Sequence, residues 1–463
     1  MQVEPSIFKA YDIRGTYPAQ IDATVAYSVG RAYGTLLSNR EHGRTMHVVV
    51  GSDMRLSSPE LKKDLTQGIL DSGLNADDIG LISTPTFYFG VAYFGYDGGI
   101  MVSASHNPKE WNGFKLASKR ALPISKDNGI VEMQRMIERE QFISLASGKE
   151  IGTLRNKNGI VETAVREQLK DLSAGKNAIK PFKIAFDGGS GMGGADMKQL
   201  FSVLPCKIAW MNEIPDGTFP AHPADPMVPE NTEALRKEIV DGHCDLGIAS
   251  DGDGDRYFFF DEKGEVVPAE ILRGIMAQIE LRKNPGATVV YDVRPGKITK
   301  DMIEEAGGKP ILAPVGHSLI KAKMIEEKAI FGGESSGHYF YKLPYGTFEA
   351  PIVLVYKFLT FLSEQNKPLS EIIAPYKRYF NSGEINTHLE NREAGSQKIE
   401  KIAEKFKDCK QSLLDGLTVE SEDYWFNVRL SNTEPLIRFI VEARTKALME
   451  EKRREILVLV KEK

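Results

Sequence analysis

Several features that mark particular classes of protein are missing from this sequence of 463 residues. Its three cysteines (Cys206, Cys244 and Cys409) are scattered and odd in number, so neither disulfides nor a zinc site is expected. The opening residues, MQVEPSIFKAYD, lack the basic-then-apolar pattern of a signal peptide. The longest apolar stretch, near Pro351 to Leu362, is interrupted by Lys357 and is too short to cross a bilayer. We therefore expect a cytoplasmic protein with no membrane partner.

The sequence also lacks an excess of positive charge. Its 59 Lys and Arg residues are outnumbered by 64 Asp and Glu residues, and the net charge is −5. Without a long basic block, this balance argues against a dedicated nucleic-acid partner. Hydrophobic residues at 41% and charged residues at 27% are typical of a soluble globular protein. At about 150 residues per domain, the length suggests roughly three domains.

What the sequence does contain is an internal repeat. Three β-branched runs end in a small or acidic turn: HVVVGSDMR (47–55), KIAFDGGSG (183–191) and TVVYDVRPG (288–296). Helix-compatible sequence follows each run; after the first, Ser58 is expected to cap a helix that has Pro59 at its first position. Each segment then has a second strand with a polar exit: GIMVSASHNP, DLGIASDGDGDR and AIFGGESSGH. The alternation predicts βαβ units, and ligands gather at the carboxyl ends of such strands.

The repeat predicts an α/β fold of three tandem related domains with mixed, mainly parallel sheets. We place them at residues 1–152, 153–262 and 263–376. The remaining segment, 377–463, does not repeat the pattern. It combines helical stretches with DYWFNVRLSNTEPLIRFIVEA, which reads as two strands joined by a turn. A smaller α+β domain is therefore expected at the C-terminus.

The segment SDGDGDR places Asp251, Asp253 and Asp255 at alternate positions with glycine spacers. Small spacers allow the three carboxylates to converge on one point, where a hard cation such as Mg²⁺ would offset their repulsion. The alternatives are an acidic turn and a calcium EF-hand, in which Glu262 would take the twelfth position. The EF-hand is disfavoured because Arg256 takes the sixth position, where glycine is needed, and because the flanks read as strands.

Two further loops could recognise a ligand. In FGGESSGHYF, Glu334 and Ser336 could bind adjacent hydroxyl groups of a sugar, or the segment could be a Gly/Ser-rich turn. In RLSNTEPLIR, two guanidinium groups and three hydrogen-bonding side chains form either a phosphate cradle or a hairpin with surface arginines. These five residues are Arg429, Ser431, Asn432, Thr433 and Arg438.

The segment GIMVSASHNPKEWNGFK contains a candidate nucleophile, Ser105. Its neighbour His106 is adjacent in sequence, so the pair should not easily form the nucleophile–base hydrogen bond of a hydrolase. No G-x-S-x-G motif surrounds Ser105, and Asn107 can hold the turn through its side chain. The residues alone leave two alternatives open, a nucleophile and a turn.

Taken together, the loops resemble those of the α-D-phosphohexomutase superfamily, most closely its phosphomannomutase/phosphoglucomutase branch. The matching segments are KAYDIRG (9–15), SASHNPKEWNGFK (103–115), DGDGDR (251–256), GHS (316–318), GGESSGH (332–338) and RLSNTEP (429–435). They occur in the family's order and run from near the N-terminus to near the C-terminus.

The resemblance implies four domains around a central cleft, each contributing one loop. It implies that Ser105 is phosphorylated and that Mg²⁺ bridges its phosphate to Asp251, Asp253 and Asp255. The phosphoserine would phosphorylate a hexose monophosphate, giving a hexose 1,6-bisphosphate that serves as intermediate and activator. That molecule would turn over and return its other phosphate to Ser105, so that a 6-phosphate of mannose or glucose becomes a 1-phosphate. The activity would be that of an isomerase acting on a phosphosugar.

Further site residues follow from the resemblance. Arg14, Lys115 and His317 would take part in catalysis, with Lys115 either a general acid/base or a charge partner. His317 could equally begin a helix beside a Ser318 cap. The substrate-binding set would comprise Tyr11, His106, Arg256, Arg294, Glu334, Ser336 and His338, and Arg256 would help to neutralise the transferring group.

Two departures from the family pattern concern substrate choice. Arg294 stands where this branch often has Lys, and Ser335 stands where the mannose/glucose branch often has Met and the glucosamine branch often has Gln. A phosphoglucosamine mutase therefore remains an alternative. A catalytically silent sugar-phosphate-binding protein and a serine hydrolase using Ser105 are alternatives from other classes. Either a monomer or a dimer is compatible with the sequence.

Overall fold

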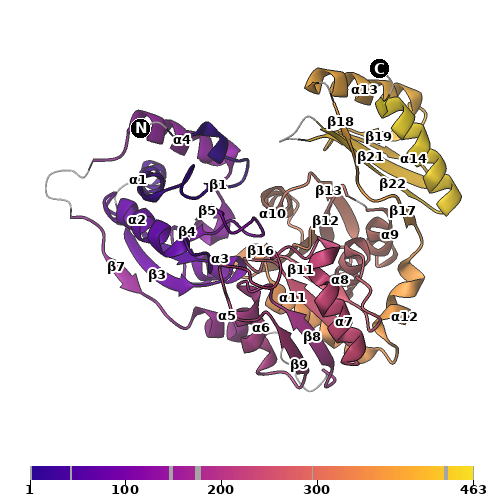
Figure 1. Ribbon diagram of the computed structural model, residues 1–463, viewed down its shortest axis with the longest axis horizontal. Coiled ribbons are helices and arrows are strands. Elements are labelled where there is room, and N and C mark those ends of the chain that lie inside the picture. The colour runs from indigo at the N-terminus through magenta and orange to yellow at the C-terminus, as the bar shows by residue number, and fades with distance from the viewer. Residues whose placement is uncertain are drawn as a thin grey trace. The chain divides into compact units, whose positions relative to one another are not determined.

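The computed structural model describes residues 3–41, 44–144, 150–170, 172, 179–294, 296–389, 391–431 and 436–461. The chain divides into two compact units (Figure 1). Unit 1 comprises Met1–Val266 and Tyr339–Leu369, and unit 2 comprises Val267–His338 and Ser370–Lys463.

Unit 1 contains two sheets and a β-hairpin, with helices between the strands. Its strands are β1 (Ile13–Thr16), β2 (His47–Ser52), β3 (Asn75–Leu81), β4 (Gly98–Val102), β5 (Trp111–Ser118), β6 (Leu122–Pro123), β7 (Leu154–Asn156), β8 (Lys183–Asp187), β9 (Lys207–Met211), β10 (Leu246–Ser250), β11 (Tyr257–Phe260), β15 (Tyr339–Leu343) and β16 (Gly346–Glu349). Its helices are α1 (Ala23–Arg40), α2 (Ser58–Leu70), α3 (Thr84–Tyr93), α4 (Ile130–Arg139), α5 (Ile160–Leu169), α6 (Gly193–Phe201), α7 (Glu233–Asp241) and α11 (Pro351–Glu364).

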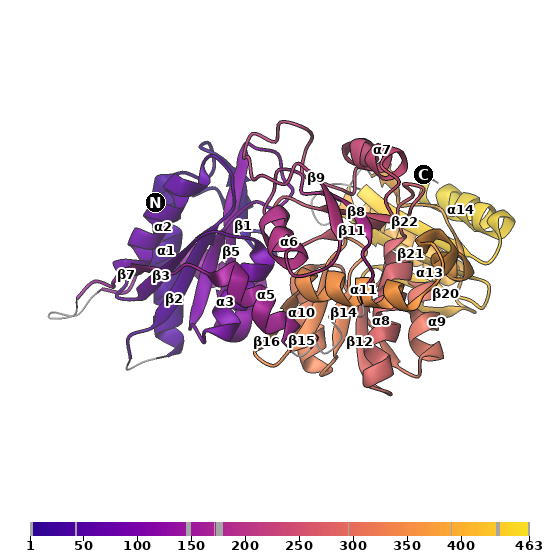
Figure 2. The same ribbon diagram turned by 90° about the horizontal axis from the view of Figure 1, so that it is seen from below.

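The first sheet has the order β1-β5-β4-β2-β3-β7, and its central strands β4, β2 and β3 are parallel. Figure 2 shows β2, β3 and β7 of this sheet near the N-terminus. Strand β2 is buried on both faces, as its β-branched run predicts. Val48 and Val50 join the core formed with α1, α2 and α4, whereas Val49 faces Phe87 of α3. Strand alternation thus explains why helices cover both faces of this sheet.

The second sheet repeats the core of the first. Its order is β11-β10-β8-β9, with β10, β8 and β9 parallel and β11 antiparallel to β10. In the first sheet, β5 is likewise antiparallel to β4. In both sheets a short connection therefore follows the carboxyl end of the third parallel strand and leads into a strand that is antiparallel to it.

Unit 2 contains the third copy of the repeat and the C-terminal sheet. Its strands are β12 (Thr288–Asp292), β13 (Lys309–Ala313), β14 (Phe331–Gly333), β17 (Phe380–Asn381), β18 (Ile385–His388), β19 (Lys410–Ser412), β20 (Leu417–Glu420), β21 (Tyr424–Leu430) and β22 (Leu436–Ala443). Its helices are α8 (Ala269–Lys283), α9 (Lys297–Glu305), α10 (His317–Glu326), α13 (Arg392–Lys405) and α14 (Lys446–Lys461); α12 (Leu369–Ile373) begins at the boundary of the units. The parallel order β14-β12-β13 matches β4-β2-β3 and β10-β8-β9, which confirms the internal repeat.

The C-terminal sheet is antiparallel and differs from the other three. Its order is β17-β22-β21-β20-β19, and β18 also pairs with β22. Its core includes Phe426, Phe439 and Ile456, which bring β21, β22 and α14 together. The predicted α/β class with a smaller α+β C-terminal domain is confirmed.

One expected helix start is wrong by a residue. Helix α2 begins at Ser58, with Ser57 as its N-cap and Pro59 at its second position. The Ser58 hydroxyl does not cap the helix, because it donates to Asp53 Oδ1 at 2.7 Å.

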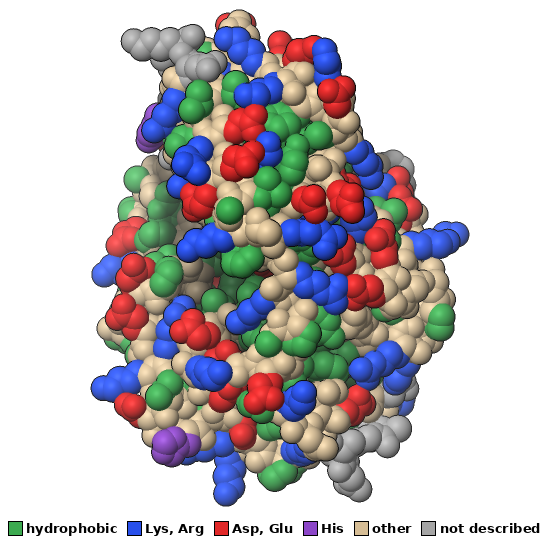
Figure 3. All heavy atoms as spheres, turned by 90° about the vertical axis from the view of Figure 1, so that its right-hand side faces the viewer, with side chains coloured by type: hydrophobic (Ala, Val, Ile, Leu, Met, Phe, Trp, Pro, Cys, Tyr) green, Lys and Arg blue, Asp and Glu red, His purple; other side chains and the backbone are tan. Residues whose placement is uncertain are grey.

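The sequence analysis expected neither an excess of positive charge nor a segment that crosses a membrane. Figure 3 shows Lys and Arg side chains interspersed with Asp and Glu on the face in view. In the described part of the chain, no helix combines the length and the apolar character needed to cross a membrane.

Candidate active site

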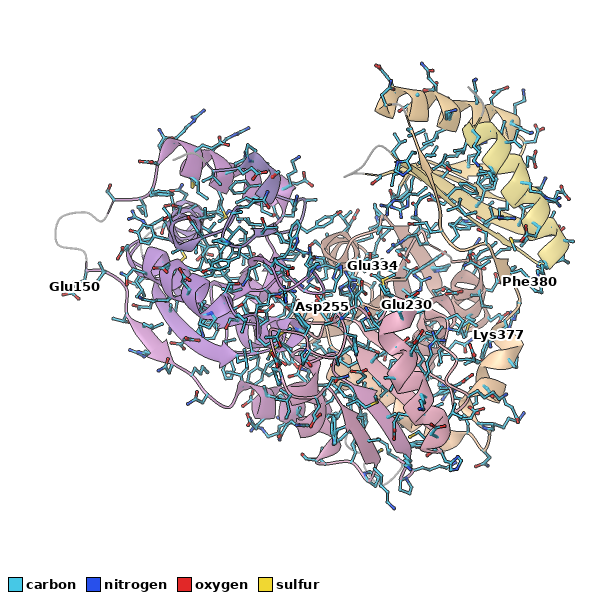
Figure 4. The ribbon with its side chains drawn as sticks, in the orientation of Figure 1. Glu150, Glu230, Asp255, Glu334, Lys377 and Phe380 are labelled. Carbon is cyan, nitrogen blue, oxygen red and sulfur yellow. The ribbon has the colours of Figure 1, made fainter. Side chains whose placement is uncertain are left out.

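Three of the loops singled out in the sequence follow the third parallel strand of a repeat. The serine loop follows β4, the aspartate loop follows β10 and the Glu334 loop follows β14. The first two belong to unit 1 and the third to unit 2. Asp255 and Glu334 are labelled in Figure 4.

Ser105 is buried and has an unusual backbone. Its φ of +52° lies in the left-handed region, which costs energy for a residue with a side chain. The Ser105 N–H donates to Ser103 Oγ at 3.0 Å, and Ser105 Oγ donates to Asp251 Oδ2 at 3.0 Å. The strained conformation thus brings the hydroxyl into contact with the aspartate loop.

The structure corrects the prediction for His106. Its Nδ1 lies 3.2 Å from Ser105 Oγ, so adjacent residues do form the contact that the sequence argument disfavoured. Burial, together with the charges of Arg256 and Arg14, lowers the pKa of His106 to about 2. The ring therefore stays neutral at physiological pH, and it lies beside the serine oxygen.

The three aspartates converge as predicted. Carboxylate oxygens of Asp251, Asp253 and Asp255 lie within 4.8 Å of one another, and all three residues are buried. Burial and the charges of Asp255 and Asp253 raise the pKa of Asp251 well above its usual range. Within the described residues, Asp253 Oδ1 is buried and accepts no hydrogen bond. An excess of buried carboxylate oxygen with an unused acceptor fits a hard divalent cation.

Lys115 projects from β5 onto the same carboxylates. Its Nζ lies 2.6 Å from Asp253 Oδ2 and 2.6 Å from Asp255 Oδ2. Burial alone would lower the pKa of Lys115, but these two carboxylates raise it well above the ordinary value. Lys115 is thus held as an ammonium ion and forms ion pairs with both carboxylates. Arg256 is more distant, with its Nε 3.8 Å from Asp251 Oδ2.

The N-terminal segment contributes Arg14 on β1. Its guanidinium donates to Asn107 Oδ1 at 2.7 Å and pairs with Asp12. Burial alone would lower the pKa of Arg14, but Asp12 and the aspartate loop raise it. Tyr11 is half-buried in the turn before β1. Arg14 therefore joins the serine loop and the aspartates as one group of charges in unit 1.

The sequence analysis missed the residues that hold the aspartate loop. Thr84, the first residue of α3, donates from Oγ1 to Asp253 Oδ2 at 2.5 Å and from its N–H to Asp253 O at 3.0 Å. A Cβ added at Gly252 would lie 2.5 Å from Ser105 O, so glycine is required where the two loops meet. The contacts join residues far apart in the sequence, and no local pattern identifies them.

Arg55 was also missed, although it ends the run GSDMR that begins in β2. It is buried, and its guanidinium donates to four carbonyl groups of the serine loop and the residues after it. The only local signal was a basic residue directly after a buried strand.

In unit 2, Glu334 is the centre of a second buried group. Its Oε1 accepts from Gly316 N–H at 2.9 Å and from Arg294 at 3.3 Å, and its Oε2 lies 3.2 Å from His338 Nδ1. Ser336 Oγ lies 2.9 Å from the same nitrogen. Burial alone would raise the pKa of Glu334, but the hydrogen bond with His338 and the charges of His338 and Arg294 lower it. Glu334 is therefore held ionised.

Ser335 belongs to the framework of this loop. Its Oγ donates to Arg294 O at 2.5 Å and lies 2.9 Å from Asp292 Oδ1. The buried Arg273, which the sequence analysis missed, donates to Ser335 Oγ at 3.2 Å and to Arg294 O at 3.1 Å. The hydroxyl of Ser335 thus bonds within the protein.

His317 is the first residue of α10, and Gly316 is the N-cap. The expected Ser318 cap is wrong, since Ser318 is the second residue of the helix. The ring of His317 stacks on that of His338, with centroids 5.9 Å apart and planes inclined by 20°. His317 therefore joins the Glu334 group.

The C-terminal loop joins β21 to β22. Arg429 and Arg438 are paired across these strands, and both contact Glu384, at 2.7 Å and 3.4 Å respectively. Ser431 is buried, whereas Asn432 and Thr433 lie outside the described residues. Sequence reasoning missed Glu384, which lies between two arginines that would otherwise repel each other.

Four family models match the chain in succession. They describe phosphoglucomutase/phosphomannomutase alpha/beta/alpha domain I (residues 5–143), domain II (164–264), domain III (269–379) and the C-terminal domain (384–458). A phosphomannomutase from Methanocaldococcus jannaschii is 37% identical over 454 residues, covering 98% of this chain and 97% of that protein. The chain belongs to the phosphoglucomutase/phosphomannomutase family.

Other relatives agree with this assignment. A phosphomannomutase from Escherichia coli strain K12 is 35% identical, covering 98% of this chain and 99% of that protein. A crystal structure of a phosphoglucomutase/phosphomannomutase family protein from Burkholderia thailandensis is 30% identical, covers 99% of this chain and 98% of that one, and has a TM-score of 0.87. The chain is thus an enzyme of the phosphoglucomutase/phosphomannomutase type, an isomerase, and the resemblance seen in its loops is confirmed.

Proposed function

We propose that this enzyme interconverts the 6-phosphate and the 1-phosphate of a hexose, mannose or glucose, through a phosphorylated Ser105. The observation that carries the proposal is the contact between Ser105 Oγ and Asp251 within the buried aspartate cluster. Several relatives named phosphomannomutase support the choice of sugar. A hydroxyl beside three carboxylates needs positive charge before it can carry a phosphate, which the fit to Mg²⁺ would meet.

In the proposed cycle, the bond between Ser105 Oγ and phosphorus breaks as a hydroxyl oxygen of the hexose monophosphate bonds to phosphorus. The proton lost by that hydroxyl replaces the phosphoryl group on Ser105 Oγ, and a hexose 1,6-bisphosphate forms. In the second step the bond between phosphorus and the other sugar oxygen breaks as Ser105 Oγ bonds to that phosphorus, and the Ser105 proton passes to the sugar oxygen, so that bonds and charges balance over one turnover. Mg²⁺, when bound by Asp251, Asp253 and Asp255, supplies charge stabilisation to the transferring phosphoryl group. Lys115, held as an ammonium ion, and Arg14 add positive charge from the chain itself.

Unit 2 supplies groups suited to the rest of the substrate. Glu334, held ionised, can accept hydrogen bonds from two neighbouring sugar hydroxyls. Arg429 and Arg438 can bind a phosphate through charge-assisted hydrogen bonds. Residue ranges 1–152, 153–262, 263–376 and 377–463 remain our proposed domain limits.

The test compares mannose 1-phosphate, glucose 1-phosphate and glucosamine 1-phosphate in coupled assays with Mg²⁺ and glucose 1,6-bisphosphate. We expect turnover of the first two, and intact-mass analysis should show a phosphate increment that is absent from Ser105→Ala. Ser202→Ala changes an exposed serine and serves as the control. Turnover of glucosamine 1-phosphate alone would establish the phosphoglucosamine mutase, and full activity in Ser105→Ala would rule out the phosphoserine.

A further inference from the structure

The guanidinium of Arg55 uses one of its five N–H donors on Asp53 and the other four on carbonyl groups of the serine loop and the residues after it. Its Nε contacts Asp53 Oδ2 at 3.2 Å. One terminal nitrogen donates to Pro108 O at 2.6 Å and Trp111 O at 2.9 Å, and the other to Ser105 O at 2.7 Å and Asn107 O at 2.6 Å. An arginine side chain has five N–H groups in a fixed plane, so none remains free.

Arg55 is itself held in place from both ends. Its side chain is fully buried, and Asp53, also fully buried, accepts from the Arg55 N–H at 3.0 Å and from Ser58 Oγ at 2.7 Å. The ring of Phe219 covers the guanidinium, with its centroid 5.4 Å from the central carbon. Gly217 passes so close that a Cβ there would lie 2.9 Å from Arg55 Cα. A planar group in such surroundings has one available orientation.

We infer that Arg55 is a positioning residue for phosphoryl transfer, which fixes the left-handed conformation of Ser105 by binding the carbonyl groups of its loop. This inference rests on the proposed function. The loop must place Ser105 Oγ at Asp251 while Ser105 has a φ of +52°, a conformation that a free loop would leave. Four carbonyl groups bound to one rigid cation oppose that relaxation.

The chemistry explains why arginine is needed. A lysine at residue 55 would keep the positive charge but would offer three donors at one point, which cannot reach four carbonyls spread over Ser105 to Trp111. Each buried carbonyl left without a donor favours a rearranged loop. A displacement of the nucleophile by 1 Å is enough to slow a positioned reaction by about 10²-fold.

The inference is tested with Arg55→Lys in the full-length enzyme. We expect kcat to fall by about 10²-fold while KM for the hexose phosphate changes by less than about threefold, because substrate recognition lies elsewhere. Arg31→Lys is the matched control: Arg31 is half-buried in the same unit, donates to Ile143 O and does not contact the serine loop. Wild-type kcat in folded Arg55→Lys would overturn the inference, as would a loss confined to KM.

A second measurement does not depend on activity. Hydrogen exchange of peptides covering residues 103–113 should rise at least about tenfold in Arg55→Lys and stay unchanged in Arg31→Lys. Asp53→Asn, which removes the negative charge that Arg55 contacts, should show the same change to a smaller extent and replaces Arg55→Lys in the test if that variant does not fold. If the wild-type enzyme turned over no hexose phosphate, the proposed function would fail while faster exchange would still support the fixing of the loop. Unchanged hydrogen exchange in Arg55→Lys and in Asp53→Asn would reject the inference that Arg55 fixes the loop.

Discussion

The aspartate loop after β10 and the Glu334 loop after β14 occupy equivalent positions in two repeats, yet their charges are balanced in opposite ways. The first concentrates three buried carboxylates, and the pKa of Asp251 is raised by burial and by its acidic neighbours. The second has one buried carboxylate among Arg294 and His338, and the pKa of Glu334 is lowered. The same backbone position therefore yields one loop with three clustered carboxylates, two of which contact Lys115, and one loop with a single carboxylate that contacts Arg294 and His338. This difference supports a cation at the first loop and a sugar hydroxyl at the second.

The largest expected effect comes from removing charge at the first loop. Asp253→Asn should lower kcat by at least about 10²-fold, because it removes a proposed ligand of Mg²⁺ and with it the positive charge that would stabilise the transferring phosphoryl group. Mg²⁺ binding, followed by calorimetry, should be lost in parallel. Asp241→Asn changes an exposed aspartate at the end of α7 and should leave both properties unchanged. Wild-type Mg²⁺ affinity in Asp253→Asn would show that the cluster does not hold the metal.

A change at the second loop should have a smaller and different effect. Glu334→Gln keeps the shape of the side chain but removes a charged acceptor, which is worth about 1.5 to 3 kcal/mol in a hydrogen bond. We expect kcat/KM for the hexose phosphate to fall by about 10- to 100-fold. Mg²⁺ binding should be unaffected in the same preparation. Loss of Mg²⁺ binding in Glu334→Gln would remove the contrast between the two loops.

The last prediction concerns stability rather than activity and a buried carboxylate outside both loops, Glu442, which accepts from the Gly296 and Lys297 N–H groups at the start of α9. Burial, with a contribution from Glu270, raises the pKa of Glu442 to about 7. Between pH 4.5 and 7 the folded protein therefore binds a proton that the unfolded chain has lost. Stability is full below this window and falls as the pH rises through it, by up to about 3 kcal/mol.

Glu442→Gln should remove most of that decline, because the amide oxygen still accepts from both N–H groups and cannot ionise. Urea unfolding followed from pH 4.5 to 8.5 measures the change, with the exposed Glu404→Gln as control. An unchanged pH dependence in Glu442→Gln would mean that another group causes it. The pH dependence caused by Glu442 thus serves as a reference for the buried carboxylates of the two loops, since Glu442 lies outside both.

The sequence predicted those parts of the molecule that local patterns determine. β-branched runs with small, polar exits identify β2, β8 and β12 and the strands that carry the loops, and alternate aspartates with glycine spacers identify the acidic cluster. The groups that support the site were missed because their contacts are distant in sequence. Arg55 and Ser105 are 50 residues apart, and Thr84 and Asp253 are 169 apart.

The contact between Ser105 and His106 was predicted wrongly for a different reason. The sequence argument was that the nucleophile and base of a hydrolase come from separate segments, so it expected no such contact between adjacent residues. The left-handed conformation of Ser105 is a property of the folded loop and has no signature in residue types. Residues with such conformations are where reasoning from spacing fails, and they are common at functional sites.

Glu384 has a consequence for how a phosphate would arrive and leave. Its carboxylate already bridges Arg429 and Arg438, so a phosphate binding there exchanges one anion for another. Such an exchange keeps the two guanidinium groups oriented between binding events. It also lowers the affinity for the incoming phosphate, because an existing ion pair must first be broken. In the proposed cycle, a bisphosphate that must rebind in a second orientation would be served by a moderate affinity of this kind.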